Sequence, residues 1–255
     1  MQRPAPEVAR IALACLDLTS LNAADTEAQI AALCRRAVNP HGAVAALCVW
    51  PRLARFARAN LRSDVAVAAV ANFPDGSADI ERALRDTDEI VQAGAQEVDV
   101  VLPYRALRAG DEAACAALLQ AVRRACEGLL LKVILETGEL RESRLIDRAS
   151  RLALDAGADF LKTSTGKTPI SATPEAAQRM LRSIAADPQA RARVGFKAAG
   201  GVRSVADAAV YVDQVGSALG ADALVPARFR IGASALLGDI ERVLDRRGGW
   251  AASGY

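Results

Sequence analysis

Short runs of apolar residues alternate with longer amphipathic segments from one end of the chain to the other. The short runs are rich in Val, Leu and Ala and predict strands, whereas the longer segments predict helices. Strands are expected near residues 15–18, 44–49, 66–72, 97–102, 130–135, 160–163, 194–197 and 228–231. The clearest helices are expected over 77–94, 111–126, 141–155, 173–186 and 204–217.

Regular alternation of strands and helices with short connections favours parallel pairing and right-handed crossovers. About eight such units in 255 residues predict an α/β fold, a (β/α)8 TIM barrel, with an open doubly wound sheet as the alternative. No linker or low-complexity segment divides the chain, so a single catalytic domain is expected over residues 1–255. The C-terminal segment 248–255 is small and polar, and it is expected to be mobile.

A weak internal repeat places two charged residues at equivalent positions. The segment AGAQEVDV (93–100) aligns without a gap with AGADFLKT (156–163), so that Asp99 falls opposite Lys162. These strands would be the fourth and the sixth. Because alternate strands of a barrel contribute to the same layer of inward side chains, Asp99 and Lys162 are expected in one layer inside the barrel.

Composition narrows the range of functions. The net charge of +2, without a long basic run, disfavours binding to nucleic acid or to an anionic membrane. No signal peptide or run of transmembrane length is found, and the five cysteines are widely spaced, which predicts a cytoplasmic protein. The single histidine, His41 in a turn-like segment, excludes a His-rich zinc site and disfavours a Ser-His-Asp system.

Lys162 and Lys197 end two adjacent predicted strands, at the face where barrel enzymes place their active sites. Either lysine could extend to the surface instead, but two of them, each followed by a loop of small residues, favour an inward pair. Burial and a nearby second cation both lower the pKa of a lysine, which then forms a Schiff base at neutral pH. Asp99 would balance part of the charge and transfer protons.

Three glycine-containing segments follow the last predicted strands: STGK (164–167), AGGVRS (199–204) and RIGAS (230–234). Glycine lets backbone amides approach an anion, and a helix N-terminus adds partial positive charge. One such segment could be an ordinary turn, but three in successive loops predict a phosphate site near strands seven and eight. Lys167 and Arg203 can add positive charge there.

Four other residues are considered for the same site. Asp17 is expected to face the barrel mouth, although it could cap a turn instead. Cys48 could line the pocket, but a place in the core is favoured. Glu136, at the end of the fifth strand, could orient a lysine, and Lys132 in that strand could face either way.

These motifs resemble those of the deoxyribose-phosphate aldolases, a class I aldolase family. The resemblance covers nearly the whole chain and is carried by LDLTSLN (16–22), NFPDG (72–76), EVDVVLPYRALRAGD (97–111), LLKVILETGEL (130–140), AGADFLKTSTGK (156–167), GFKAAGGVR (195–203), FRIGAS (229–234) and the terminal Tyr255. It implies reversible cleavage of 2-deoxy-D-ribose 5-phosphate to acetaldehyde and D-glyceraldehyde 3-phosphate, without a metal or organic cofactor. Members are often dimers, so a homodimer is expected.

Matched residue by residue, the resemblance implies that Lys162 forms the Schiff base, that Lys197 lowers its pKa, and that Asp99 relays protons with Lys197 and water. The residues expected to contact the substrate are Asp17, Thr19, Cys48, Gly166, Lys167, Gly200, Gly201, Val202, Arg203, Gly232, Ser234 and Tyr255. The terminal tyrosine would fold over the site and assist proton transfer. Ala198 and Ala235 replace a proline and a serine that are frequent in the family, which implies a weaker grip on the phosphate.

Two other classes of protein explain part of the pattern. A sugar-phosphate isomerase or synthase on the same barrel would use the glycine loops, but it would form no imine and would need no pair of inward lysines. A phosphometabolite-binding barrel without catalytic activity would give Lys162 no special reactivity.

Overall fold

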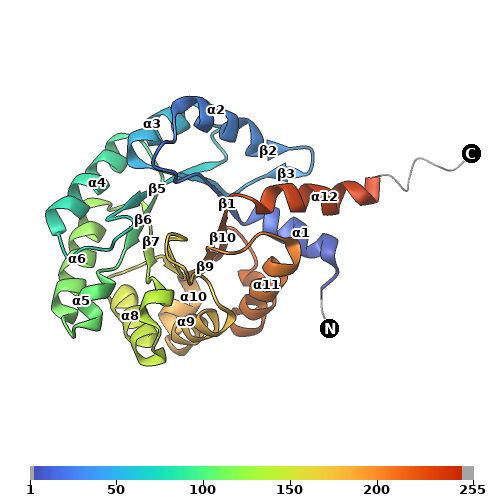
Figure 1. The fold of residues 1–255 in the computed structure, drawn as a ribbon. Coiled ribbons are helices and arrows are strands. Elements are labelled where there is room, and N and C mark those ends of the chain that lie inside the picture. Colours follow the sequence, from blue (N-terminus) through green and yellow to red (C-terminus); the bar gives the residue numbers. More distant parts are fainter. Residues whose placement is uncertain (1–2, 249–255) are drawn as a thin grey trace, which may run out of the picture.

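A computed structural model describes residues 3–248, in which eight parallel strands close into a barrel surrounded by helices (Figure 1). The barrel strands are β1 (Leu16–Thr19), β4 (Ala46–Val49), β5 (Ala66–Ala71), β6 (Glu97–Val101), β7 (Leu130–Ile134), β8 (Phe160–Lys162), β9 (Gly195–Ala199) and β10 (Phe229–Ala233). Each strand pairs with the next one along the chain, and β10 pairs with β1. The TIM-barrel prediction is therefore confirmed, and the open sheet is wrong.

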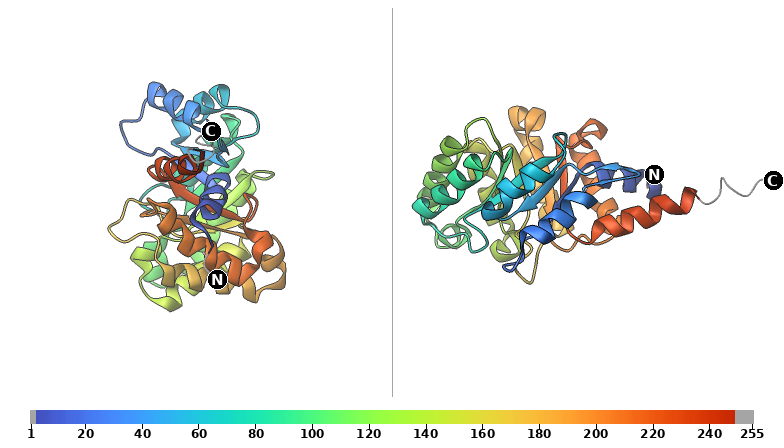
Figure 2. Two further views of the ribbon diagram at one scale, coloured as in Figure 1. Left: turned by 90° about the vertical axis from the view of Figure 1, so that its right-hand side faces the viewer. Right: turned by 90° about the horizontal axis from the view of Figure 1, so that it is seen from above.

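Helices form the outer layer of the barrel, as Figures 1 and 2 show. They are α1 (Ala5–Ala14), α2 (Glu27–Arg36), α3 (Pro51–Asn60), α4 (Ile80–Gln92), α5 (Tyr104–Arg108), α6 (Glu112–Ala125), α7 (Thr137–Leu140), α8 (Ser143–Asp155), α9 (Pro174–Ala186), α10 (Pro188–Arg193), α11 (Val205–Leu219), a short 3-10 helix (Ala221–Ala223) and α12 (Leu236–Gly248). The predicted helices over 77–94, 111–126, 141–155, 173–186 and 204–217 are confirmed, with ends that shift by at most about three residues.

The helix starts follow from capping side chains. At the start of α11, the Ser204 hydroxyl accepts from the backbone N–H of Asp207 at 3.1 Å, while the Asp207 carboxylate accepts from the backbone N–H of Ser204 at 3.0 Å. Such a reciprocal pair satisfies two backbone donors that a helix leaves free. The start of α11 is therefore fixed beside the loop that carries Gly200 and Gly201.

The hydrophobic core lies between the strands and the helices, because successive side chains of a strand point to opposite faces. Strand β6 shows the division: Val98 and Val100 belong to the hydrophobic core, whereas Glu97 and Asp99 are buried among charged side chains. The barrel interior is therefore the polar part of this fold and the place where chemistry can occur.

A short antiparallel hairpin, β2 (Val38–Asn39) and β3 (Gly42–Ala43), was not predicted, because two-residue strands show no alternation. The predicted turn around His41 is the turn of this hairpin. The His41 ring Nε2 lies 2.7 Å from the Asp245 carboxylate of α12, so His41 supports the outer layer far from the barrel interior.

No helix within residues 3–248 combines the length and the apolar character needed to cross a membrane. The predicted mobile tail lies outside the described residues, except Gly248, at which α12 ends. Tyr255 also lies outside them.

Candidate active site

Lysine is confined to one part of this molecule. The whole chain has four lysines among its many basic residues. Lys132 on β7, Lys162 on β8 and Lys197 on β9 are all buried inside the barrel. The fourth, Lys167, is exposed in the loop after β8 and lines a pocket at the barrel mouth. The side chain that forms imines is therefore concentrated at a single site.

The strand register explains why these charges meet. Lys162 and Lys197 are direct partners across β8 and β9, and Asp99 and Lys132 are direct partners across β6 and β7. Register partners on neighbouring strands point to the same face of the sheet. The Lys162 ammonium group lies 2.7 Å from the Asp99 Oδ2 atom, so the two residues that the internal repeat aligned do lie together inside the barrel.

Asp99 is the acceptor shared by the three interior lysines. Its Oδ1 atom accepts from Lys132 at 2.8 Å, and its Oδ2 atom accepts from Lys162 and from Lys197, each at 2.7 Å. Burial alone would raise the pKa of Asp99, but the three lysine charges hold it well below its ordinary value. Asp99 is therefore a carboxylate throughout the neutral range.

The three lysines differ in their carboxylate partners. Among the described residues, Lys132 donates to Glu97 and Asp99, and Lys197 donates to Asp17 and Asp99, whereas Lys162 has Asp99 alone. Burial lowers the pKa of Lys162 below its ordinary value, and the charge of Lys197 lowers it further against the opposing effect of Asp99. The partners of Lys132 and Lys197 raise the pKa of each despite burial. Lys162 is therefore the lysine most easily made neutral.

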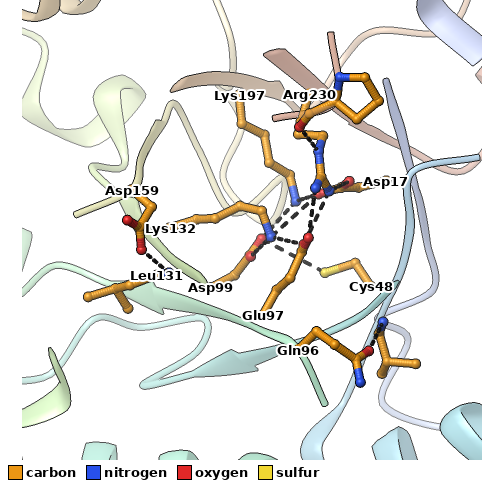
Figure 3. A network of polar contacts seen from close by, with 12 residues as sticks. Asp17, Cys48, Gln96, Glu97, Asp99, Leu131, Lys132, Asp159, Lys197 and Arg230 are labelled. Atoms are coloured by element: carbon orange, nitrogen blue, oxygen red, sulfur yellow. Dashed lines mark hydrogen bonds and ion pairs between the residues drawn. The ribbon is translucent and has the colours of Figure 1, made fainter. Parts of the chain in front are cut away.

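A further ion pair lies deeper in the barrel. The Arg230 guanidinium on β10 donates to both carboxylate oxygens of Glu97, at 2.7 and 3.1 Å, and to Asp17 at 2.6 Å. Figure 3 shows these groups, with Asp99, Lys132 and Lys197, pointing toward one another inside the barrel.

Glu97 and Arg230 were missed by sequence reasoning, although the period of the strand carried a signal for Glu97. In EVDVV it stands two residues before Asp99 and therefore on the same face. Arg230 had no such signal, because a basic residue in a strand usually extends to solvent.

The structure corrects two expected positions. Asp17 does not face the barrel mouth: its side chain is fully buried, bonded to Lys197 and Arg230, and absent from the described lining of the pocket. Thr19, two residues further along β1, lines the pocket in its place. Cys48 is also fully buried, with its sulfur 4.0 Å from Asp99 Oδ2, and it is absent from the described lining of the pocket. It therefore occupies the core position favoured from its sequence context and does not make the substrate contact that the family resemblance implied.

A pocket of about 270 Å³ opens at the C-terminal ends of the strands. Its lining comprises Thr19, Ser20, Leu21, Asn22, Lys162, Thr165, Gly166, Lys167, Ala199, Gly200, Gly201, Val202, Arg203, Gly232, Ala233, Ser234 and Ala235. Lys162 is the interior lysine that reaches this pocket, whereas Lys132 and Lys197 lie behind it. The candidate phosphate residues Gly166, Lys167, Gly200, Gly201, Val202, Arg203, Gly232 and Ser234 all lie around the same opening.

Gly200 brings two of the pocket loops into contact. Its φ is +85°, and a Cβ there would lie 2.5 Å from Ser171 Cβ and 3.1 Å from the Cα of Gly166. A side chain would therefore separate the loops after β8 and β9. Segment 164–167 does not lead directly into a helix, since α9 begins only at Pro174. Helix N-termini thus flank the pocket at α11 and α12.

Glu136 fixes the loop after β8. In the described part of the chain it forms no hydrogen bond or ion pair with a lysine, so the expected role of orienting a lysine is not observed. Its carboxylate accepts from the hydroxyl and the backbone N–H of Thr165, and from the hydroxyl of Thr168 at 3.3 Å. Burial raises its pKa above the ordinary value. The contacts of Glu136 therefore hold the segment that presents Gly166 and Lys167 to the pocket.

No group of three or more His, Cys, Asp and Glu side chains placed to hold a metal ion occurs between residues 3 and 248. The acidic side chains of the barrel interior are instead bonded to lysine and arginine. The arrangement offers a buried amine, an adjacent carboxylate and a cationic pocket mouth.

Known proteins show the same combination of fold and sequence. A deoxyribose-phosphate aldolase from Agrobacterium fabrum is 46% identical over 261 residues, covering 100% of this chain and 98% of that protein. A solved structure described as a candidate deoxyribose-phosphate aldolase from Toxoplasma gondii superposes with a TM-score of 0.85 at 25% identity, covering 98% of this chain and 97% of that chain. A similarly described structure from Coccidioides immitis gives a TM-score of 0.82 at 30% identity, covering 95% and 88%.

The family comparison agrees with these likenesses. The model of the DeoC/LacD family aldolases matches residues 11–239, which include every barrel strand and the whole lining of the pocket. The chain therefore belongs to the DeoC/LacD aldolase family.

Proposed function

We propose that this aldolase reversibly cleaves 2-deoxy-D-ribose 5-phosphate to acetaldehyde and D-glyceraldehyde 3-phosphate, with Lys162 as the Schiff-base nucleophile. The activity is that of a deoxyribose-phosphate aldolase, an aldehyde-lyase. The observation that carries the assignment of the nucleophile is the position of Lys162: it is the interior lysine that lines the pocket, and its pKa is lowered by burial and by Lys197.

The first step is the attack of the neutral Lys162 amine on the aldehyde carbon of the open-chain sugar. Loss of water from the resulting carbinolamine gives an iminium ion, which withdraws electrons from the neighbouring carbons. A lysine that stayed protonated would have no lone pair for this attack. The lowered pKa of Lys162 therefore serves the chemical step directly.

Cleavage follows when the C3 hydroxyl loses its proton. The C2–C3 bond breaks, its electron pair enters the iminium to give an enamine, and C3 becomes the aldehyde carbon of glyceraldehyde 3-phosphate. Protonation of the enamine carbon and hydrolysis release acetaldehyde and restore Lys162. Asp99 and Lys197, 2.7 Å apart and directly behind the nucleophile, are the groups that we assign to proton transfer through water.

The glycine loops bind the phosphate in this account. The exposed side chains of Lys167 and Arg203 add positive charge beside Gly166, Gly200 and Gly201. Thr19 and Asn22 on the β1 side lie where they can contact the sugar. Ala235 lines the pocket without a hydroxyl group, which supports the expected weaker grip on the phosphate.

An assay of both products tests the proposal. The purified enzyme is incubated with 2-deoxy-D-ribose 5-phosphate, and acetaldehyde and D-glyceraldehyde 3-phosphate are quantified separately. We expect equal amounts of the two products, turnover at background level in Lys162→Arg, and near-normal turnover in the control Cys34→Ser on the outer helix α2. An isomerised sugar phosphate with no acetaldehyde would instead support the isomerase class.

A homodimer is supported by the family resemblance, and a cytoplasmic location is supported by the five cysteines, all within the described range, which form no disulfide there. Light scattering of the purified enzyme measures the oligomeric state.

The role of Tyr255 in closing the site and assisting proton transfer is tested by Tyr255→Phe, for which we expect a loss in kcat with little change in KM.

A further inference from the structure

Charged groups in the barrel interior are unequal in number. Among the described residues, three carboxylates, Asp17, Glu97 and Asp99, are in contact with four basic groups. The basic groups are Lys132, Lys162, Lys197 and Arg230. All seven side chains are at most 6% exposed. If every group were ionised, this enclosed cluster would hold one excess positive charge.

An excess charge in a buried cluster is unfavourable, so the group that most easily loses a proton will do so. Arginine stays protonated in proteins, which excludes Arg230. Lys132 and Lys197 each bond to two carboxylates, as described above. Lys162 bonds to Asp99 alone among the described residues, and that carboxylate is shared with the other two lysines. The proton is therefore lost from Lys162.

We propose that Glu97 and Arg230 are positioning residues for this reaction, because they set the number of charges in the barrel interior: the positive charge of Arg230 keeps Lys162 as a neutral amine, and the negative charge of Glu97 partly offsets that effect. The inference rests on the proposed role of Lys162 and goes beyond it. Neither Glu97 nor Arg230 lines the pocket, so both act through Asp17, Lys132 and the groups in contact with Lys162.

The contacts of Glu97 and Arg230 show how the influence passes upward. Arg230 bonds to Asp17 at 2.6 Å, and Asp17 bonds to Lys197, the register partner of Lys162. Glu97 bonds to Lys132, which in turn bonds to Asp99 at 2.8 Å. Removing either charge changes the balance felt by Lys162 without removing any of its direct contacts.

Other groups around Lys162 do not restore the balance. The described titratable neighbours outside the cluster are Cys48 on β4, Glu136 after β7, and Lys167 and Arg203 at the pocket mouth. Burial raises the pKa of the Cys48 thiol, which favours its neutral form. The Glu136 carboxylate is bonded to Thr165 and Thr168 and forms no ion pair with Lys162 in the described part of the chain. Strand β5 carries only alanine and valine. Lys167 and Arg203 are exposed, where solvent screens their charge.

The test measures the amine of Lys162 directly. Each variant is treated with acetaldehyde and cyanoborohydride over a range of pH, and ethylation of the Lys162 peptide is quantified by mass spectrometry. Ethylation of the exposed Lys167 in the same sample is the internal reference for reagent reactivity. The ratio of the two rates reports the pH at which Lys162 becomes neutral, and it does not require turnover.

Opposite charge deletions are expected to give opposite shifts. Arg230→Met removes a positive charge, so Lys162 is protonated more readily and the ethylation midpoint rises by about one pH unit. Glu97→Gln removes a negative charge, so the midpoint falls by about one unit. The double variant restores the charge balance, and its midpoint returns close to that of the wild type. Arg230→Lys retains the charge and is expected to leave the midpoint unchanged.

Shifts in the same direction, or no shift in folded variants, would overturn the inference. If Arg230→Met does not fold, Glu97→Gln decides alone, because any result other than a lower midpoint contradicts the charge count. The surface pair Arg62→Met and Asp64→Asn is the control in which no shift is expected, since both residues are exposed. Failure of the proposed function is distinguishable, because wild-type Lys162 would then show no ethylation above that of Lys167.

Discussion

Lys162 and Lys197 are register partners on adjacent strands, and both donate to the same oxygen of Asp99, each at 2.7 Å. One carboxylate oxygen cannot fully compensate two ammonium groups, so the pair is unequal. Lys197 also bonds to Asp17 and keeps its proton, whereas Lys162 faces the pocket with a lowered pKa. The division between a nucleophile and a permanent cation thus follows from the partners of each lysine.

Replacing Asp99 by asparagine tests proton transfer. Asp99→Asn keeps the shape of the side chain but removes the charge that three lysines share. We expect kcat to fall by about 10²- to 10⁴-fold, the range typical for loss of a group that moves protons. Cys48→Ser, close to the same carboxylate, is the matched control and should change kcat by less than about tenfold. Steady-state assays of both variants decide the point, and equal losses in the two would contradict the assignment.

Replacing Lys167 tests the phosphate site. Lys167→Gln removes a positive charge from the pocket mouth without touching the buried cluster. We expect KM for 2-deoxy-D-ribose 5-phosphate to rise by about tenfold, since a hydrogen bond to a charged group is worth about 1.5–3 kcal/mol. Activity toward unphosphorylated 2-deoxy-D-ribose should be unchanged, and the exposed Arg85→Gln on α4 should affect neither substrate. Equal effects on both sugars would place the phosphate elsewhere.

The fold could be read from the sequence because strand and helix periods differ clearly, and all eight predicted barrel strands are observed. The pairing of Asp99 with Lys162 was also accessible through the internal repeat. The depth of each inward side chain was not, because it depends on strand stagger in the closed barrel. Asp17 was therefore placed too near the mouth, and the buried ion pair of Glu97 with Arg230 remained hidden.

Stability should fall in acid. Burial alone would raise the pKa values of Asp17 and Asp99, but the neighbouring cations hold both pKa values below the ordinary value. Both carboxylates therefore favour the folded state when they are ionised. That stabilisation is fully present above the unfolded-state pKa of about 4 and is lost as pH falls toward the lower native pKa values. Urea unfolding between about pH 6 and pH 3 should show a free energy of unfolding that decreases steadily below about pH 4. A constant value down to pH 3 would show that the two carboxylates contribute little.

The thiols should be unreactive in the native enzyme. All five cysteines are buried, and burial raises the pKa of Cys15 to about 12 and that of Cys115 to about 11. Because the thiolate is the reactive form, labelling by a thiol reagent at pH 8 should be slow until a denaturant is added. Titration of free thiols with and without guanidinium measures this difference. Fast labelling of native Cys48 would mean that the barrel interior opens to solvent.

Reductive trapping of the imine tests the central claim most directly. The enzyme is mixed with acetaldehyde and borohydride, digested, and each lysine-containing peptide is examined by mass spectrometry, which is simple because the chain has four lysines. We predict an ethyl adduct on Lys162 at neutral pH and its loss in Lys162→Arg. An adduct on Lys132 or Lys197 in preference to Lys162, or no adduct in folded enzyme, would contradict the assignment of Lys162 as the nucleophile.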